Sequence, residues 1–124
     1  MSDDPHVRTT VLIVDDHASF RAAARRMLEA DGFEVVGEAG DAASGLRLAR
    51  DLSPDLVLLD VVLPDLSGFE VADRLADEPP AVVLVSSRDR ADFGRRLRDS
   101  PALGFVSKDR LSGRRLRALQ ARSR

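Results

Sequence analysis

Four short apolar runs constrain the fold of this 124-residue chain more than any other feature. Each run is rich in Val, Leu or Ile and lacks the apolar–polar alternation of a strand with one face in water. Strands of this kind are buried on both faces, as in a parallel sheet that helices cover on each side. The four runs are residues 9–14, 56–59, 81–85 and 104–107.

Segments with a helical pattern lie between and after these runs, because apolar residues recur in them every three or four positions. A further short strand is predicted at residues 33–39. Five strands then alternate with five helices, which is the doubly wound α/β class. The predicted helices are residues 18–30, a segment from Asp41 to a break at Pro54, a segment from Ser67 to Pro79, and residues 90–98 and 111–121. The residues predicted to face inward are Phe20, Ala24, Met27, Leu28, Ala42, Leu46, Ala49, Phe69, Ala72, Leu75, Ala76, Phe93, Leu97, Leu111, Leu116 and Leu119.

Length and composition predict a single domain, folded over about 8–121 between a short polar N-terminal tail and an Arg-rich C-terminal end. The absence of cysteine excludes disulfides, thiolate catalysis and Cys-based zinc sites. The two histidines, His6 and His17, are too few for a histidine-rich metal cage. The chain shows no signal peptide and no apolar stretch of roughly 18 residues, so we expect a cytoplasmic protein without a membrane partner.

Polar residues follow four of the predicted strands at the points where the strands end. Asp15 and Asp16 follow the first run, Asp60 follows the second, Ser86 follows the third and Lys108 follows the last. The ligand site of a parallel α/β sheet lies outside the carboxyl ends of its strands. We therefore expect three carboxylates, a hydroxyl and an ammonium group to converge there.

Three carboxylates in one place repel one another, and Lys108 supplies only one compensating charge. A hard divalent ion such as Mg²⁺ suits the remainder, because it prefers oxygen ligands and keeps waters for a phosphate group. Asp60 would lie at the centre, where its carboxylate can act as a nucleophile and form an aspartyl-phosphate. Ser86 and Lys108 would contact the phosphoryl oxygens, and the metal would stabilise their charge in the transition state.

These residues carry a family resemblance. Four segments resemble, in the same order, the receiver domain of bacterial two-component response regulators, and the resemblance covers essentially the whole chain. It implies a CheY-like (flavodoxin-like) fold with strand order 2-1-3-4-5. The four segments are VLIVDDH (11–17), PDLVLLDVVLPDLSG (54–68), VLVSSRD (83–89) and GFVSK (104–108).

The resemblance implies a role for each matching residue. Asp60 would be the phosphoacceptor of the domain. Asp15, Asp16 and Asp60 would hold Mg²⁺, with the backbone carbonyl of Val62 as a further ligand. The remaining roles implied are a switch hydroxyl for Ser86, a switch aromatic for Phe105, a paired cation for Lys108, and loop-shaping residues for Pro64 and Gly68.

The resemblance also implies partners rather than a conventional enzyme activity. A sensor histidine kinase or a phosphotransfer protein would donate the phosphoryl group, and a downstream protein would read the phosphorylated state. A homodimer is open, through the fourth helix, fifth strand and fifth helix or through the first and fifth helices. The residues Gly37-Glu38-Ala39 in the second strand and Lys108-Asp109 after the fifth most resemble those of receivers that precede LuxR-type DNA-binding domains. A stand-alone receiver is favoured here, and an excised receiver of a DNA-binding regulator is the alternative.

Several features leave alternatives open. Receivers often have a proline after the lysine, joined by a cis bond, and a cis bond to Asp109 would cost about 3 kcal/mol. His17 is expected in the first turn of a helix, exposed to solvent, although it adjoins the acidic pair. The arginines are expected on solvated helix faces, and no base-reading motif accompanies them, so we expect no direct nucleic-acid binding. These arginines are Arg95, Arg96, Arg98, Arg114, Arg115, Arg117, Arg122 and Arg124.

Other functional classes fit the sequence less well. A receiver fold used for docking without phosphorylation would be expected to have lost at least one site residue. A flavin carrier needs a phosphate-binding loop rich in Gly, Ser or Thr after the first strand, and Asp15-Asp16-His17 stands there instead. A Mg²⁺-dependent phosphatase would need a second aspartate two residues after Asp60, and Val62 occupies that position.

Overall fold

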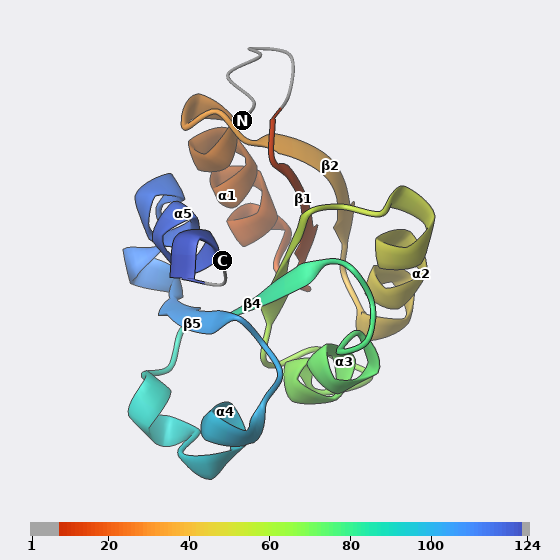
Figure 1. The fold of residues 1–124 in the computed structure, drawn as a ribbon, viewed down its shortest axis with the longest axis vertical. Helices are drawn as coiled ribbons and strands as arrows, with labels where there is room; N and C mark the ends of the chain where they lie inside the picture. Colours follow the sequence, from red (N-terminus) through yellow and green to blue (C-terminus); the bar gives the residue numbers. More distant parts are fainter. Residues whose placement is uncertain (1–7, 123–124) are drawn as a thin grey trace.

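The computed structural model describes residues 8–122 and contains one five-stranded parallel sheet in the order β2-β1-β3-β4-β5 (Figure 1). This order is the one that the family resemblance implied, so the CheY-like prediction is confirmed. The predicted polar tail before residue 8 and the last two residues lie outside the described range. The strands are β1 (Thr10–Val14), β2 (Glu34–Ala39), β3 (Leu56–Asp60), β4 (Ala81–Ser86) and β5 (Gly104–Ser107).

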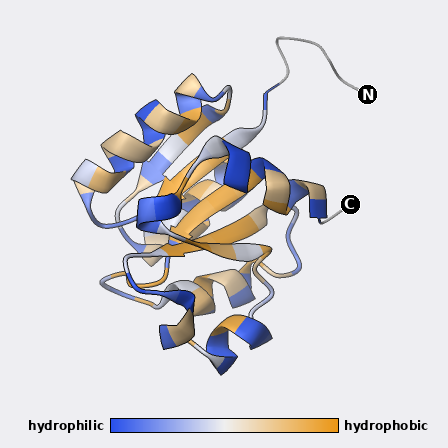
Figure 2. Ribbon diagram, turned by 90° about the vertical axis from the view of Figure 1, so that its left-hand side faces the viewer, coloured by the Kyte–Doolittle hydropathy of each residue, from blue (hydrophilic) through white to orange (hydrophobic). Residues whose placement is uncertain are grey.

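Helices cover both faces of the sheet (Figure 1). Along β1, Val11 and Ile13 pack on the side of α1 and α5, whereas Leu12 and Val14 pack on the side of α2 and α3. Both faces of the strands are therefore apolar, as Figure 2 shows by the hydrophobic colour of the sheet between its helices. The helices are α1 (Ala18–Ala30), α2 (Ala42–Leu52), α3 (Gly68–Arg74), α4 (Arg95–Asp99) and α5 (Gly113–Arg122), with 3₁₀ turns η1 (Arg90–Asp92) and η2 (Lys108–Arg110).

Most of the predicted inward-facing residues lie in the core. Ala24, Leu28, Ala42, Leu46, Ala49, Phe69, Ala72, Leu75 and Leu116 are buried, and Phe20, Met27, Phe93, Leu97, Leu111 and Leu119 are half-buried against them. Two of the helix starts also follow from sequence. The Asp41 carboxylate accepts the Ser44 amide, and the Ser67 hydroxyl accepts the amide of Phe69. These are ordinary N-caps, because they satisfy amides that have no partner within the helix.

The single helix predicted over residues 90–98 is wrong. The structure has a 3₁₀ turn and a separate short helix, joined at Gly94, whose φ is +49°. That left-handed conformation suits glycine and ends a right-handed helix. Only Phe93 and Leu97 contact the core, so burial does little to hold a longer helix together.

The third helix is shorter than predicted. It ends at Arg74 rather than continuing to Pro79, and the Ala76 amide already bonds to Asp73 in the tighter three-residue pattern. Ala76 is consequently exposed, which corrects its predicted inward position. The fifth helix begins at Gly113 rather than at residue 111. None of the helices between residues 8 and 122 is both long and apolar enough to cross a membrane.

Candidate functional site

The carboxyl ends of β1, β3 and β4 bring three buried polar residues to one edge of the sheet. Asp15 is 0% exposed, Asp60 is 3% exposed and Ser86 is 2% exposed. Within residues 8–122 these are the only buried polar or charged residues. Burying such groups opposes folding unless other groups compensate them. Their concentration at one edge therefore marks a site rather than a chance arrangement.

Lys108, which follows β5, provides the compensating charge. Its Nζ lies 2.6 Å from Asp15 Oδ2 and 3.4 Å from Asp60 Oδ2, and its side chain is only 16% exposed. The ammonium also lies 4.4 Å from the centre of the Phe20 ring, a favourable cation–π contact. The described residues contain no cis peptide bond, so the bond from Lys108 to Asp109 is trans. The ammonium reaches both carboxylates with this trans bond.

Asp15 is the more strongly held of the two buried carboxylates. Oδ1 accepts the backbone amide of His17 at 2.7 Å, and Arg21 donates to the Asp15 carbonyl at 2.6 Å. Burial acts to raise the pKa of Asp15, but Lys108 and the His17 contacts outweigh it and leave that pKa lowered. Oδ2 is paired in charge with Lys108, yet within residues 8–122 no hydrogen-bond donor is aligned with it.

Asp60 is in the opposite electrostatic situation. Burial is the main cause that raises the pKa of Asp60, and the neighbouring Asp15 charge raises it further. The Val62 amide, which donates to Oδ1 at 3.2 Å, and the more distant Lys108 oppose this rise only in part. Each Asp60 oxygen accepts one hydrogen bond, Oδ1 from the Val62 amide and Oδ2 from Lys108 at 3.4 Å, yet these do not offset the cost of burying the ionised carboxylate beside Asp15.

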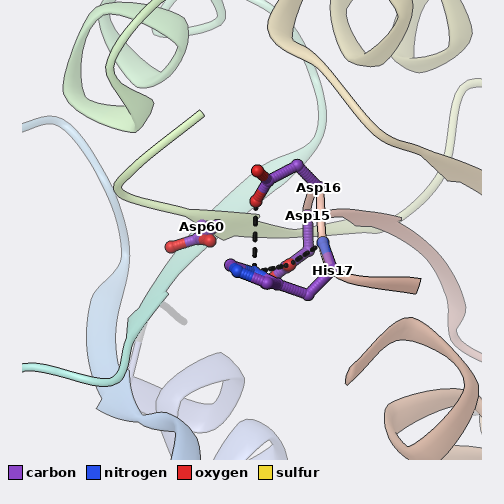
Figure 3. A group of neighbouring side chains, drawn as sticks. All are labelled: Asp15, Asp16, His17 and Asp60. Atoms are coloured by element: carbon purple, nitrogen blue, oxygen red, sulfur yellow. Dashed lines mark hydrogen bonds and ion pairs between the residues drawn. The ribbon is translucent and has the colours of Figure 1, made fainter. Parts of the chain in front are cut away.

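The exposed residues Asp16 and His17 complete a four-residue group with Asp15 and Asp60 (Figure 3). Each of the four offers one ligand atom, and these atoms all lie within 4.8 Å of one another, which makes the group a candidate site for a metal ion. His17 is exposed, as predicted, but it occupies the N-cap position of α1 instead of its first turn. Its Nδ1 lies 3.0 Å from Asp15 Oδ1 and 3.1 Å from Asp16 Oδ1.

The loop after Asp60 is fixed at both of its ends. Val62 forms an isolated bridge with Ser67, and the Gly68 amide donates to the Val61 carbonyl at 2.7 Å. A side-chain carbon on Gly68 would overlap the Asp60 carbonyl oxygen, so only glycine allows α3 to start this close to the end of β3. The loop therefore presents the Val62 backbone beside the site.

Asp65 ties this same loop to α2. Its two carboxylate oxygens accept the amides of Ala42 at 2.8 Å and Ala43 at 3.0 Å. These two hydrogen bonds lower the pKa of Asp65, because they stabilise its ionised form. This contact was not predicted from the sequence. It joins residues more than twenty positions apart, and the only local signal is a carboxylate in the loop after β3.

Ser86 and Phe105 lie on the side of β4 and β5. The buried Ser86 hydroxyl accepts the Arg88 amide at 3.0 Å, whereas Ser87 is exposed, so the site position belongs to Ser86. Phe105 is half-buried and its ring centre lies 5.6 Å from that of Phe93. It also borders a surface cavity of about 490 Å³ between η1, β5 and the start of α5.

A family model of the response regulator receiver domain matches residues 11–120. The chain belongs to this receiver family. The most informative solved structure is the signal receiver domain of the response regulator NarL from Mycobacterium tuberculosis. It is 33% identical to this receiver with a TM-score of 0.80, and the match covers 92% of this chain and 94% of that one.

Two curated relatives of this receiver are named as regulators of transcription. BvgA of Bordetella pertussis, named a positive transcription regulator of virulence factors, is 43% identical over 100 residues, which are 79% of this chain and 48% of BvgA. The transcriptional regulatory protein PdtaR of Mycobacterium tuberculosis is 38% identical over 107 residues, which are 85% of this chain and 52% of PdtaR. The receiver spans about half the length of these relatives.

Proposed function

We propose that this receiver accepts a phosphoryl group on Asp60 from the phosphohistidine of a sensor histidine kinase or phosphotransfer protein. The observation that carries the proposal is the pair of buried carboxylates, Asp15 and Asp60, facing the half-buried ammonium of Lys108. Two buried carboxylates beside one ammonium leave an uncompensated negative charge, which a divalent cation would neutralise so that an anionic phosphoryl group can approach Asp60. The new bond joins an Asp60 oxygen to phosphorus as the bond from phosphorus to the donor imidazole breaks.

The residues at this edge fit Mg²⁺. In the described part of the chain, the buried Asp15 Oδ2 has no hydrogen-bond partner besides its ion pair with Lys108, and Asp16 adds a carboxylate open to solvent. An all-oxygen set of carboxylates, the Val62 carbonyl and water is the kind that Mg²⁺ prefers. Asp15, Asp16, Asp60 and the Val62 carbonyl would hold the ion. When bound, Mg²⁺ would neutralise the carboxylates and the charge on the phosphoryl oxygens.

The chain's own residues would orient and stabilise the transferring group. The Val62 amide fixes the plane of the Asp60 carboxylate through Oδ1. Lys108 lies near Oδ2 and can pair with one phosphoryl oxygen. The Ser86 hydroxyl already accepts an amide, so its own proton remains free to donate to another phosphoryl oxygen. Movement of Ser86 toward the phosphoryl group, with Phe105 following, would shift the domain between two states.

The output surface would be the face of α4, β5 and α5, read by a downstream protein or by a second copy of the chain. A homodimer through α1 and α5 is the other arrangement that the family suggests. Because BvgA and PdtaR are about twice the length of the aligned region, a longer DNA-binding regulator containing this receiver is a second candidate. We place the protein in the cytoplasm, where kinases of this class donate their phosphoryl groups.

Incubation with acetyl phosphate tests the phosphoacceptor role. We expect intact mass spectrometry to show one added phosphoryl group with Mg²⁺ and none with EDTA or in Asp60→Asn. Ser86→Ala should slow labelling, and Ser87→Ala is the matched control because that neighbour is exposed. Equal labelling of Asp60→Asn would refute the assignment. Mg²⁺ binding without labelling by any phosphodonor would favour a docking module that works without phosphorylation.

A further inference from the structure

The His17 ring is committed to the acidic cluster rather than to the helix that it precedes (Figure 3). Residues at the N-cap position commonly use the side chain to accept an amide of the first turn. His17 holds that position with extended backbone angles, φ −94° and ψ 106°, yet its side chain makes no capping hydrogen bond. Its Nδ1 instead contacts one carboxylate oxygen each of Asp15 and Asp16.

The distances within the group match those between neighbouring ligands of a metal ion. Two ligands at right angles, each about 2.1 Å from an ion, are about 3.0 Å apart. His17 Nδ1 lies 3.0 Å from Asp15 Oδ1 and 3.1 Å from Asp16 Oδ1. All four ligand atoms lie within 4.8 Å of one another, and two opposed ligands of such an ion are about 4.2 Å apart. The Asp16 and His17 side chains are 39% and 64% exposed, so rotation of either can adjust the separations to that span.

A second observation points to a ligand at the same place. Asp15 is wholly buried, and within residues 8–122 its Oδ2 has no hydrogen-bond partner besides its ion pair with Lys108 at 2.6 Å. The backbone amide of His17 holds the other oxygen, Oδ1, at 2.7 Å. Asp15 is thus a fixed and dehydrated anion, and the exposed imidazole of His17 lies directly beside it. This combination suits capture of a cation between them.

An imidazole nitrogen changes which cation the site prefers. Carboxylate, carbonyl and water oxygens suit Mg²⁺, whereas imidazole suits first-row transition ions. We propose that His17 Nδ1 is a ligand of the ion held by Asp15, Asp16 and Asp60, so that this receiver favours Mn²⁺, Co²⁺ or Zn²⁺ over Mg²⁺. The proposal rests on the metal site of the proposed function and adds a nitrogen ligand to it. The ring proton then resides on Nε2, which water can satisfy because the side chain is exposed.

Pulsed electron paramagnetic resonance of the Mn²⁺-loaded protein tests the ligand directly. A coordinated imidazole gives a nitrogen coupling, which we expect in the wild type and not in His17→Gln. His6→Gln is the matched control, since His6 is the other histidine of the chain, and it should keep the coupling. A wild-type spectrum without nitrogen coupling would overturn the proposal, as would a coupling that survives in His17→Gln.

Affinity measurements by calorimetry give an independent readout. His17→Gln should weaken Co²⁺ binding by at least about tenfold, the lower end of the effect of losing even an outer-shell partner. Mg²⁺ binding should change much less. Tighter Mg²⁺ binding with unchanged Co²⁺ binding would instead show that the ring blocks the site, which overturns the proposal. Acetyl phosphate labelling distinguishes failure of this proposal from failure of the proposed function. A nitrogen coupling without labelling would support His17 as a metal ligand and refute Asp60 as the phosphoacceptor. Labelling without a nitrogen coupling would support Asp60 as the phosphoacceptor and refute His17 as a metal ligand.

Discussion

Replacing Lys108 with methionine should destabilise the domain strongly when no divalent ion is present. The ammonium is 2.6 Å from Asp15 Oδ2 and 3.4 Å from Asp60 Oδ2. At an effective dielectric constant of about 20, these two attractions amount to about 6 and 5 kcal/mol before desolvation is counted. Desolvation of the buried ions offsets much of this sum, and breaking a buried pair costs about 3–5 kcal/mol in practice. We expect Lys108→Met to lose about that much stability.

Urea unfolding in EDTA at neutral pH measures the loss. The matched control is Arg50→Met, which removes the ion pair of Arg50 with Glu78 at 3.1 Å on the surface, where such pairs contribute about 0–1 kcal/mol. Lys108→Met with Asp15→Asn should regain part of the loss, because one buried charge disappears with its partner. A loss for Lys108→Met no larger than that of the control would refute the electrostatic account of the site.

Three further predictions concern regions outside the site. Gly113→Ala should cost about 1–3 kcal/mol, because its new methyl carbon would lie 2.6 Å from Asp31 Cβ. A hydrogen bond from Arg25 is the main cause that lowers the pKa of Glu38 in the folded state. Ionised Glu38 therefore stabilises the folded state at pH values above its pKa in the unfolded chain, and this stabilisation is lost as the pH falls through the lower pKa of the folded state. Glu38→Gln should therefore flatten the acid limb of the stability curve. A symmetric dimer through α4, β5 and α5 should strengthen with salt, because residues 88–122 hold ten arginines and only four carboxylates.

Each of these three predictions has a contradicting outcome. Gly40→Ala is the control for Gly113→Ala, since the nearest atom to its new carbon is 3.6 Å away. Equal melting temperatures for the two variants would contradict the predicted clash at Gly113. A Glu38→Gln protein with an unchanged acid transition in circular dichroism would remove that ion pair as a source of pH dependence. Sedimentation showing a dimer that dissociates on adding sodium chloride would mean that opposite charges, not like charges, meet across the interface.

The sheet and the main site residues were predictable because each depends on a short, local signal. A strand buried on both faces must be apolar at every position, so β1, β3 and β4 stand out as continuous runs. Parallel strands bring their carboxyl ends to one edge, which is enough to place Asp15, Asp60 and Lys108 together. Neither step needed knowledge of a distant contact.

The missed features depend on contacts between distant segments or on one backbone angle. Asp65 caps α2 from the loop after β3, and no periodic pattern connects those two places in the sequence. Gly94 interrupts a segment of good helix formers through a positive φ that composition does not specify. His17 was correctly expected to be exposed, but an exposed ring can still lie on a neighbouring carboxylate. Side-chain direction at a helix N-cap is decided by tertiary structure.

The opposed pKa directions of Asp15 and Asp60 connect stability to function. The strand order brings both carboxylates to one edge of the sheet, and Lys108 lies closer to Asp15 than to Asp60. The ionised form of Asp15 is therefore stabilised, whereas the ionised form of Asp60 is destabilised by burial and by the Asp15 charge. A cation that neutralises the two carboxylates finds them together only in the folded state, so its binding must stabilise that state. At a concentration 100 times its dissociation constant such a ligand adds about 2.7 kcal/mol. Mg²⁺ should therefore reduce the penalty of Lys108→Met, since the ion then supplies the charge that the lysine supplied. If Mg²⁺ stabilised the variant less than it stabilised the wild type, the ion and the ammonium would not be acting on the same carboxylates.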